Sequence, residues 1–198
     1  GTSGGSITDP VQVKLSGGGY LTDVKAISAG TQWSMALKQD ETVWTWGNNY
    51  YGARGTGIGN SDNNSMLLVA TQVKSSSVFS QIIAIAAGGQ HSLALKSDGS
   101  VLAWGSNDNG QIGIGCYLYN CSIVYSPVKV MDNAISIAAG SSHSIAVKTD
   151  GGVWGFGRTI EGQLGSVIGI FGVQGSPIQI PGITGIKSVW ANEVWNVA

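Results

Sequence analysis

The stretch Ile83–Gly115 reads IAIAAGGQHSLALKSDGSVLAWGSNDNGQIGIG, and it contains the unit from which the chain is built. Within it, His91–Lys96 carries leucine at alternate positions with smaller or polar residues between, which predicts a β-strand with two unlike faces. Ser-Asp-Gly-Ser at 97–100 favours a tight turn, because Asp bonds its own backbone and Gly accepts positive φ. Val101–Gly105 returns as a second strand, so the unit predicts a β-meander.

The same unit recurs along the chain with a period of about fifty residues. Its opening glycine stands at positions 30, 88 and 140, and Asn192 takes that place in an incomplete fourth copy, so the intervals are 58, 52 and 52 residues. The complete copies close with short apolar strands at Thr71–Val73, Pro127–Val130 and Pro177–Ile180. An internal period of this length, made of several short strands, indicates a propeller or a solenoid of β-units.

The shared pattern AAG-x-x-HS-x-A-(L/V)-K-(S/T)-DG-x-V-x-x-(W/F)-G, followed by GQ-(I/L)-G, resembles the regulator-of-chromosome-condensation repeat. The resemblance covers nearly the whole chain after Thr8. It implies that each repeat forms one four-stranded propeller blade, in a family whose usual ring has seven. Members include nuclear exchange factors for a small GTPase, ultraviolet receptors and a secreted bacterial β-lactamase inhibitor, which share a protein-binding ring and no common chemistry. Nothing here resembles the basic extensions of the nuclear exchange factors, so the chain looks closer to bacterial or secreted members.

We therefore expect an all-β fold, a β-propeller of four-stranded antiparallel blades with about three complete blades and a partial one, as a partial ring or arc. Repeats fill residues 10–198, and the expected segments are a flexible lead at 1–9, partial strands at 10–15, complete units at roughly 26–73, 83–130 and 135–180, and partial strands at 187–198. The N-terminal strand is a candidate to join the C-terminal pair. Because open sheet edges recruit further strands, we expect association of chains or a missing remainder rather than a free-standing monomer.

The composition points away from several functions. Charged residues make up 11% of the 198 residues, against roughly 25% in ordinary soluble proteins, and the net charge is −1. This charge gives no drive toward nucleic acid or anionic lipid, and no apolar run is long enough for membrane insertion. No phosphate-binding, dinucleotide-binding or nucleophile-elbow motif stands in a convincing setting, so we expect no enzyme and no cofactor. A sialidase needs three arginines, and the chain has only Arg54 and Arg158.

Cys116 and Cys121 lie in one loop segment, CYLYNC, and predict a local disulfide and an oxidising compartment. Two free thiols or half of a zinc site remain open alternatives, with zinc the least favoured, so no metal is expected. Asn63 and Asn120 each begin a possible glycosylation triplet. Together with the low charge, these features favour an extracellular or cell-surface location.

The loops that follow the second strands form the best candidate binding surface. Their framing glycines persist while their interiors change, as Asn48–Gly52, Ser106–Gly110 and Arg158–Gly162 show. Tyr50 and Tyr51 are the strongest anchors, because aromatic residues dominate binding hot spots. The candidate partner-binding residues are Tyr50, Tyr51, Arg54, Asn107, Asp108, Arg158 and Glu161. The alternative interpretation is a set of ordinary polar loops.

Other conspicuous residues have structural explanations. His91 and His143 share one repeat position with Trp33 and Trp195, which predicts a packing or hydrogen-bonding site at the blade top and not a catalytic one. Asp40, Asp98 and Asp150 fall in the same turn. Core packing between blades is expected for Trp44, Trp46, Trp104 and Trp154. Trp190 and Trp195 lie at an unfinished edge and suit a subunit contact.

The sequence thus predicts a non-enzymatic, secreted or cell-surface module that binds a protein partner of unknown identity. The alternative is a structural subunit of an extracellular assembly or filament, in which copies self-associate through their unfinished blade edges. An intracellular scaffold similar to a guanine-nucleotide exchange factor ranks third.

Overall fold

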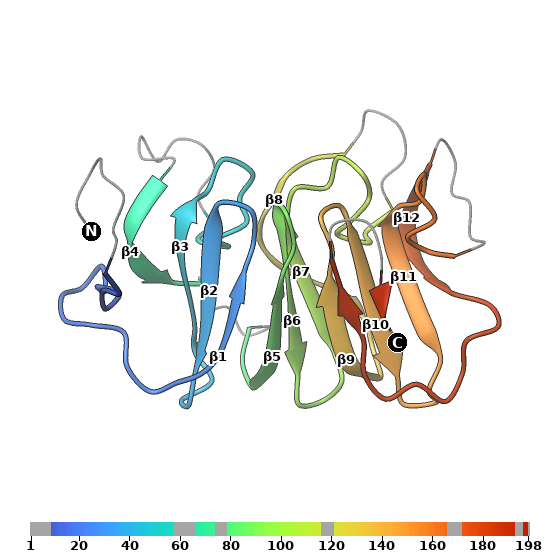
Figure 1. Ribbon diagram of the computed structural model, residues 1–198, viewed down its shortest axis with the longest axis horizontal. Helices are drawn as coiled ribbons and strands as arrows, with labels where there is room; N and C mark the ends of the chain where they lie inside the picture. The colour runs from blue at the N-terminus through green and yellow to red at the C-terminus, as the bar shows by residue number, and fades with distance from the viewer. Residues whose placement is uncertain are drawn as a thin grey trace.

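The computed structural model describes residues 9–57, 66–73, 79–115, 121–165, 172–192 and 196–197. They form three four-stranded antiparallel meanders and one two-stranded sheet (Figure 1). Blade 1 contains β1 (Val24–Ala29), β2 (Trp33–Lys38), β3 (Val43–Asn48) and β4 (Met66–Gln72). Blade 2 contains β5 (Ile82–Ala87), β6 (His91–Lys96), β7 (Val101–Gly105) and β8 (Val124–Met131). Blade 3 contains β9 (Ala134–Ala139), β10 (His143–Lys148), β11 (Val153–Arg158) and β12 (Val173–Gln179), and the two-stranded sheet pairs β13 (Trp190–Ala191) with β14 (Asn196–Val197).

The tight turns form as their sequences predict. Between β6 and β7, the Asp98 carboxylate accepts a hydrogen bond from the Ser100 amide at 2.9 Å, and Gly99 has φ of 82°. Asp40 and Asp150 accept the equivalent amide bonds in blades 1 and 3, at 3.1 and 2.8 Å. These aspartates therefore act as turn residues, as expected.

The two unlike faces predicted for the strand at His91–Lys96 are both buried. In β6, every residue from His91 to Leu95 is buried. The reason is that successive blades stack face to face, so both sides of a middle strand meet another sheet. Leu93 packs toward blade 3, whereas Ala94 packs into the cluster shared with blade 1.

The apolar core consequently lies between blades. One cluster joins Met35 and Val43 of blade 1 to Leu102 and Trp104 of blade 2. The next joins blade 2 to Phe156 of blade 3. A third cluster covers the far side of blade 3 with the segment that leads to β13, through its residues Ile183, Ile186, Val189 and Ala191.

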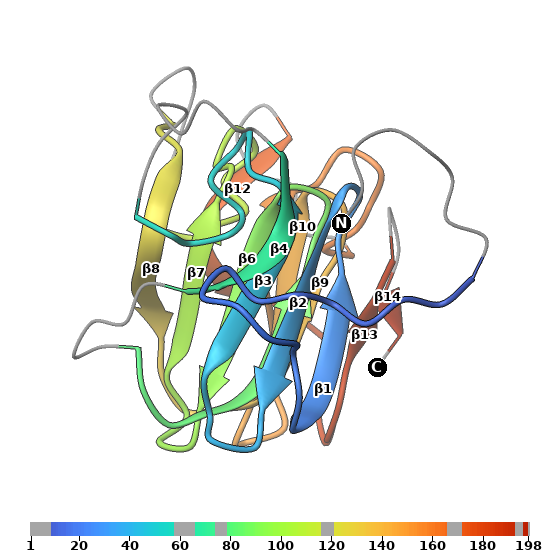
Figure 2. The ribbon, with the colours of Figure 1, turned by 90° about the vertical axis from the view of Figure 1, so that its left-hand side faces the viewer.

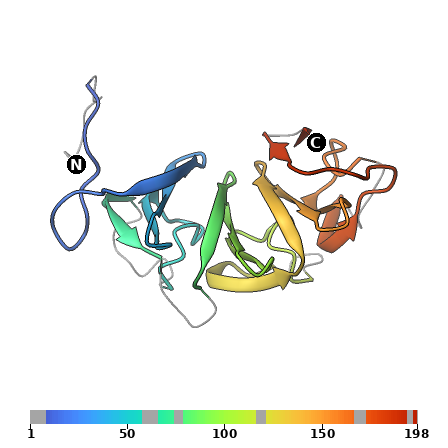
Figure 3. The same cartoon turned by 90° about the horizontal axis from the view of Figure 1, so that it is seen from below.

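The blades fan out as an open arc, with blade 1 and the two-stranded sheet at opposite ends (Figure 3). The innermost strands are neighbours, since β1 lies against β5, β5 against β9 and β9 against β13. The proposed joining of the N-terminal strand to the C-terminal pair is wrong. Leu15 instead forms a parallel bridge with Ala70 on the outer strand of blade 1 (Figure 2), with the Ala70 amide donating to the Lys14 carbonyl at 2.7 Å. The open edge of β4 thus takes up this segment locally.

The tryptophans divide by their place in the arc. Trp104 is fully buried at the boundary between blades 1 and 2, as expected. Trp154 is half-buried and packs against the cluster between blades 2 and 3, in line with the prediction. Trp44 and Trp46 are also half-buried but belong to none of the described core clusters, so core packing between blades is wrong for these two. Trp44 and Trp46 belong to the end blade, where no described sheet covers them. On Trp154, the ammonium of Lys148 lies 3.8 Å from the ring centroid.

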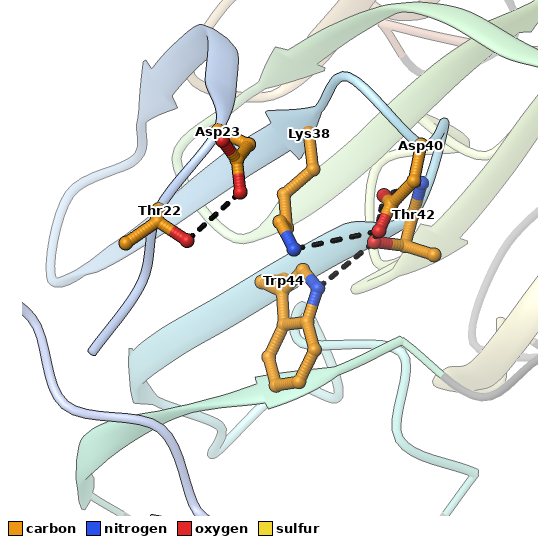
Figure 4. Close-up of polar contacts among 6 residues, drawn as sticks. All are labelled: Thr22, Asp23, Lys38, Asp40, Thr42 and Trp44. Carbon is orange, nitrogen blue, oxygen red and sulfur yellow. Dashed lines mark hydrogen bonds and ion pairs between the residues drawn. The ribbon is translucent and has the colours of Figure 1, made fainter. Parts of the chain in front are cut away.

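Figure 4 shows the polar network around Trp44 on blade 1. The indole nitrogen of Trp44 donates to Thr42 Oγ1 at 3.0 Å, and that hydroxyl donates to Asp40 at 2.6 Å. Lys38 completes the network with an ion pair to Asp40 at 3.4 Å. The hydrogen bonds from Thr42 and, less strongly, Lys38 lower the pKa of Asp40. The network keeps the polar end of the indole bonded while its ring stays partly exposed.

Candidate binding face

The loops that follow β3, β7 and β11 share one backbone frame. In the first, the Asn49 side chain accepts a hydrogen bond from the Arg54 amide five residues later, at 3.1 Å. In the second, Asn107 accepts the same bond from the Ile112 amide at 3.0 Å. Because their strands hold the same place in successive blades, these loops lie along one edge of the arc, at the top of Figure 1. We call this edge the loop face.

Tyr50 and Tyr51 give the first loop an aromatic surface. Their rings meet edge to face, with centroids 4.9 Å apart and planes at 73°, and Tyr50 is 54% exposed. The Tyr50 amide donates to Asn48 Oδ1 at 2.7 Å, and Asn48 in turn donates to Gln32 at 3.0 Å. These residues line a hollow of about 170 Å³ at the boundary between blades 1 and 2, together with Thr31, Trp33, Ala53, Gly89 and Gln90. The hollow is uncharged and combines aromatic rings with amide groups.

The other two loops present different chemistry. Asp108 is exposed on the second loop, where Ser106 donates to its carboxylate at 3.3 Å. On the third loop, Arg158 Nε donates to Glu161 Oε2 at 2.9 Å within a bidentate ion pair. Hydrogen bonds from Arg158, and then Gln163, lower the pKa of Glu161 to about 2. The loop face thus changes from aromatic through acidic to ion-paired along the arc.

Two candidate residues do not reach this surface. Arg54 is 1% exposed, and its carbonyl accepts a hydrogen bond from Thr45 at 3.0 Å. It occupies the repeat position of Ile112 and Leu164, which are core residues. Asn107 is 2% exposed and holds its own loop together. The structure therefore places five of the seven candidates on the loop face and these two in its interior.

Sequence reasoning did not find Gln32 and Gln90 as lining residues, and it placed Asn48 in the first loop without naming it as a candidate. Gln32 and Gln90 precede the second strands of blades 1 and 2, far in sequence from Tyr50. They line the hollow because blades 1 and 2 are packed side by side. The available signal was the blade architecture itself. Stacked blades place the turn before β6 of blade 2 next to the loop after β3 of blade 1.

The histidines link neighbouring blades, which confirms their expected hydrogen-bonding role. His91 Nε2 lies 2.9 Å from Ser144 Oγ of blade 3, and that hydroxyl donates to the Gln111 carbonyl at 2.8 Å. A carbonyl oxygen can only accept a hydrogen bond, so the hydroxyl proton of Ser144 lies in its bond to Gln111. His91 must therefore donate the other hydrogen bond, from a protonated Nε2 to Ser144 Oγ. Full burial, followed by the charge of His143, lowers the pKa of His91 to about 3, so the ring is neutral. We call this arrangement the boundary relay.

The boundary relay recurs between blade 3 and the β13–β14 sheet, with Asn196 in place of Ser144. His143 Nε2 lies 2.7 Å from Asn196 Oδ1, and the Asn196 amide donates to the Gln163 carbonyl. Asn196 of β14 thus makes both bonds that Ser144 makes one blade earlier. In the first boundary, Ser92 donates to the Ala53 carbonyl at 2.6 Å, and Trp33 donates to the Gly89 carbonyl at 3.4 Å.

Several predictions concern residues outside the described part of the chain. They are Cys116, Asn63, Asn120 and Trp195, so the local disulfide, the glycosylation and one edge contact stay predictions. Cys121 begins the described segment 121–165. Trp190 on β13 is 63% exposed.

Within the described residues, no group of three or more His, Cys, Asp or Glu side chains is arranged to hold a metal ion. The same residues include no helix that is long and apolar enough to cross a membrane.

A family model described as the regulator of chromosome condensation (RCC1) repeat matches residues 40–95 and 98–147, more than half of the chain. A second model of the same repeat matches residues 24–53, 82–111 and 134–163, one per blade. The chain belongs to the RCC1 repeat family. RCC1-repeat domains are a class of protein-interaction scaffold and are typically non-catalytic, although relatives include multidomain ubiquitin ligases such as human HERC2.

Two plant proteins illustrate the family relationship. The chain is 32% identical over 184 residues to the mitochondrial RCC1 domain-containing protein RUG3 of Arabidopsis thaliana, covering 91% of this chain and 38% of that protein. It is 29% identical over 157 residues to the ultraviolet-B receptor UVR8 of the same plant, covering 79% and 33%. The chain therefore spans less than half of the length of these relatives. Neither name describes a secreted or bacterial protein, so the expected closeness to such members lacks support here.

Solved structures show the same architecture. Prp20p of Saccharomyces cerevisiae superposes with a TM-score of 0.75 at 25% identity, over 89% of this chain and 43% of that chain. Human WBSCR16 superposes with a TM-score of 0.73 at 29% identity, over 86% and 43%. Prp20p is described with binding properties to Gsp1p and histones, and also in a complex with Kap60.

Proposed function

We propose that the chain is a non-enzymatic protein-binding module, and that the hollow beside Tyr50 and Tyr51 on the loop face is its principal contact with a partner. The observation that carries the proposal is the exposed aromatic pair at the rim of an uncharged hollow. Aromatic side chains supply most hot spots because they bury a large area at a low cost in side-chain entropy. Asp108, Arg158 and Glu161 would form the polar rim of the contact.

The constant frame of the loops supports this assignment. Asn49 and Asn107 hold the backbone of their loops in the same way, so a change of interior residue leaves the loop conformation intact. Such a surface can differ in chemistry from blade to blade without a cost to the fold. The amides of Gln32 and Asn48 add donors and acceptors that would orient a neutral partner segment.

The test cross-links candidate partner proteins to three forms of the chain: wild type, a Tyr50→Ala, Tyr51→Ala double variant and a Tyr20→Ala control. Mass spectrometry then quantifies how much of each partner every form retains. Tyr20 is 50% exposed but belongs to the N-terminal segment beside β4, outside the hollow. We expect one or more partners that wild type and the control retain equally and that the double variant loses at least about ten-fold. Equal retention of every partner by all three proteins would contradict the proposal.

We also propose an extracellular or cell-surface location, supported by the 11% content of charged residues and the cysteine pair. Peptide mapping of the secreted, non-reduced protein should recover Cys116 and Cys121 in one linked peptide. Recovery of both as alkylated free thiols from native source material would contradict an oxidising location.

Self-association is the second candidate function, because large apolar side chains are exposed at both ends of the arc. Ile27 of β1 is 78% exposed, whereas its repeat equivalents Ile85 and Ile137 pack against the neighbouring blade. Trp190 is 63% exposed at the other end. Light scattering should then give a multiple of the chain mass that falls for Ile27→Asp. A constant monomer at all concentrations would exclude a subunit of a filament or assembly.

A further inference from the structure

The second and third loops of the loop face each contain a buried glutamine that holds the loop together. In the second loop, Gln111 Oε1 accepts a hydrogen bond from the Asn109 amide at 2.8 Å, and Gln111 Nε2 donates to Ser106 Oγ at 3.2 Å. In the third loop, Gln163 Oε1 accepts from the Glu161 amide at 3.1 Å, and Gln163 Nε2 donates to the Glu161 carboxylate. We call the side chain of Gln111 or Gln163 the glutamine brace of its loop.

The first loop lacks this brace. Ala53 holds the repeat position of Gln111 and Gln163, since each of the three follows a glycine of the loop frame. The backbone at this position is nevertheless the same. Those preceding glycines have φ of 71°, 72° and 78°, and the carbonyl of each following residue accepts a hydrogen bond from the next sheet. The first loop therefore has the backbone of a braced loop without the side chain that braces it.

Two polar groups of the first loop hold the positions that contact the brace elsewhere. The Tyr51 amide corresponds to the amides of Asn109 and Glu161, and no acceptor for its hydrogen bond is found among the described residues. Asn48 corresponds to Ser106, and its Oδ1 accepts one backbone hydrogen bond at 2.7 Å. An amide oxygen has two lone pairs, so Asn48 Oδ1 can accept a second bond. The first loop thus offers one donor and one acceptor.

The hollow beside Tyr50 and Tyr51 occupies the place of the missing side chain. Ala53 and Asn48 both line it, and its volume is about 170 Å³. A cavity of about 150 Å³ holds a benzene molecule, so the hollow has room for the side chain of a glutamine. It lies between blades 1 and 2, which both have all four of their strands.

We propose that this hollow binds the side-chain amide of a glutamine residue from a partner protein, which takes the place of the missing brace. The carbonyl oxygen of that glutamine accepts from the Tyr51 amide, and its NH₂ group donates to Asn48 Oδ1. A glutamate fits less well, because a carboxylate has no hydrogen to donate and the hollow has an uncharged lining. The inference rests on the proposed function, in which the hollow is the contact with a partner, and it names the group that enters.

The first test uses N-acetyl-L-glutamine methylamide as the probe, with the glutamate and norleucine analogues for comparison. Nuclear magnetic resonance follows the Tyr51 amide of the ¹⁵N-labelled whole chain during each titration. We expect the glutamine probe to shift this resonance saturably and to bind at least about ten-fold more tightly than either analogue, because each analogue loses a hydrogen bond. Equal binding of the three probes, or no saturation by about 20 mM of the glutamine probe, overturns the proposal.

The second test changes which loop carries a brace. Ala53→Gln supplies the brace from the chain itself, so it should weaken binding of the glutamine probe at least about ten-fold without lowering the temperature of unfolding. Ile135→Gln adds the same side chain at a position that is 45% exposed and outside the hollow, and should leave binding unchanged. Gln111→Ala should create a second site, at which the probe shifts the Asn109 amide. Unchanged binding by Ala53→Gln overturns the proposal.

Failure of this inference differs from failure of the proposed function. Partners that are lost with Tyr50→Ala and Tyr51→Ala but retained by Ala53→Gln would show a contact that inserts no amide, and would overturn only the inference. Retention of every partner by the tyrosine double variant would overturn the proposed function itself.

Discussion

The boundary between blades 2 and 3 and the boundary between blade 3 and the β13–β14 sheet carry the same relay but different cores. His91, Ser144 and the Gln111 carbonyl form the relay in the first, and His143, Asn196 and the Gln163 carbonyl form it in the second. Of these two, and among the described residues, only the boundary between blades 2 and 3 adds a buried aromatic ring, Phe156. The two boundaries therefore share a hydrogen-bonded relay between neighbouring sheets and differ in the buried aromatic ring beside it.

The largest expected effect on stability comes from removing the aromatic ring at the boundary between blades 2 and 3. Phe156→Ala should lower the free energy of unfolding by about 3 to 5 kcal/mol, because it leaves a cavity where a fully buried ring packs. Ile183→Ala, at a half-buried position packed against the third core cluster, should cost less than about 1.5 kcal/mol. Urea titration followed by circular dichroism measures both. Equal losses would mean that the two boundaries are equally well packed.

Acidification should destabilise the protein through the relay. Burial lowers the pKa of His91 to about 3 from an ordinary 6.5, so the unfolded chain binds a proton that the folded chain excludes between these values. The free energy of unfolding should therefore fall as pH decreases below 6.5, by about 1.4 kcal/mol per pH unit and so by about 2 kcal/mol at pH 5. Above pH 6.5 this contribution is constant.

Urea titrations between pH 7 and 5 test this slope, and His91→Gln is the matched variant. Burial also lowers the pKa of His143, so the variant should keep part of the slope and lose the larger share. The acidic groups with lowered pKa values, such as Asp40 and Glu161, contribute only at lower pH because their ordinary pKa values are 3.8 and 4.5. A flat wild-type stability between pH 7 and 5 would show that His91 is not buried as a neutral ring.

The smallest effects concern the middle member of each relay. Ser144→Ala removes a buried hydroxyl and leaves His91 without its acceptor, at a cost of about 1 to 2 kcal/mol. Asn196→Ala should cost less than about 1 kcal/mol, because β14 has only two residues and Asn196 is part-buried. Thermal unfolding of the two variants beside wild type gives the ranking. A larger loss of stability for Asn196→Ala than for Ser144→Ala would contradict the expected ranking of the two relays.

Local sequence signals predicted the repeated part of the fold well. The alternation in His91–Lys96, the Asp-Gly turns and the terminal Trp-Gly each act within a few residues, so they were visible without the fold. The same signals located the loop face, because its framing glycines recur at fixed positions.

Contacts between blades were not visible in the same way. Arg54 resembles an exposed loop residue in sequence, yet it fills the interior position that Ile112 and Leu164 occupy in other blades. The relay partners Gln111 and Ser144 are 33 residues apart, and only the stacking of sheets brings them together. The N-terminal segment pairs with β4, the open edge of blade 1. Its sequence resembles the closing strand of a repeat, and this similarity did not indicate which edge it would join.

Native-state hydrogen exchange of the whole chain at neutral pH tests the central comparison most directly. We expect the amides of β10 and β11, the strands that carry Ser144 and the buried ring of Phe156, to exchange near the rate set by global unfolding. Amides of β13 and β14 should exchange through local opening, at least about a hundred-fold faster. Equal protection of β10, β11, β13 and β14 would contradict the claim that the buried aromatic ring is what distinguishes a closed boundary from an open one.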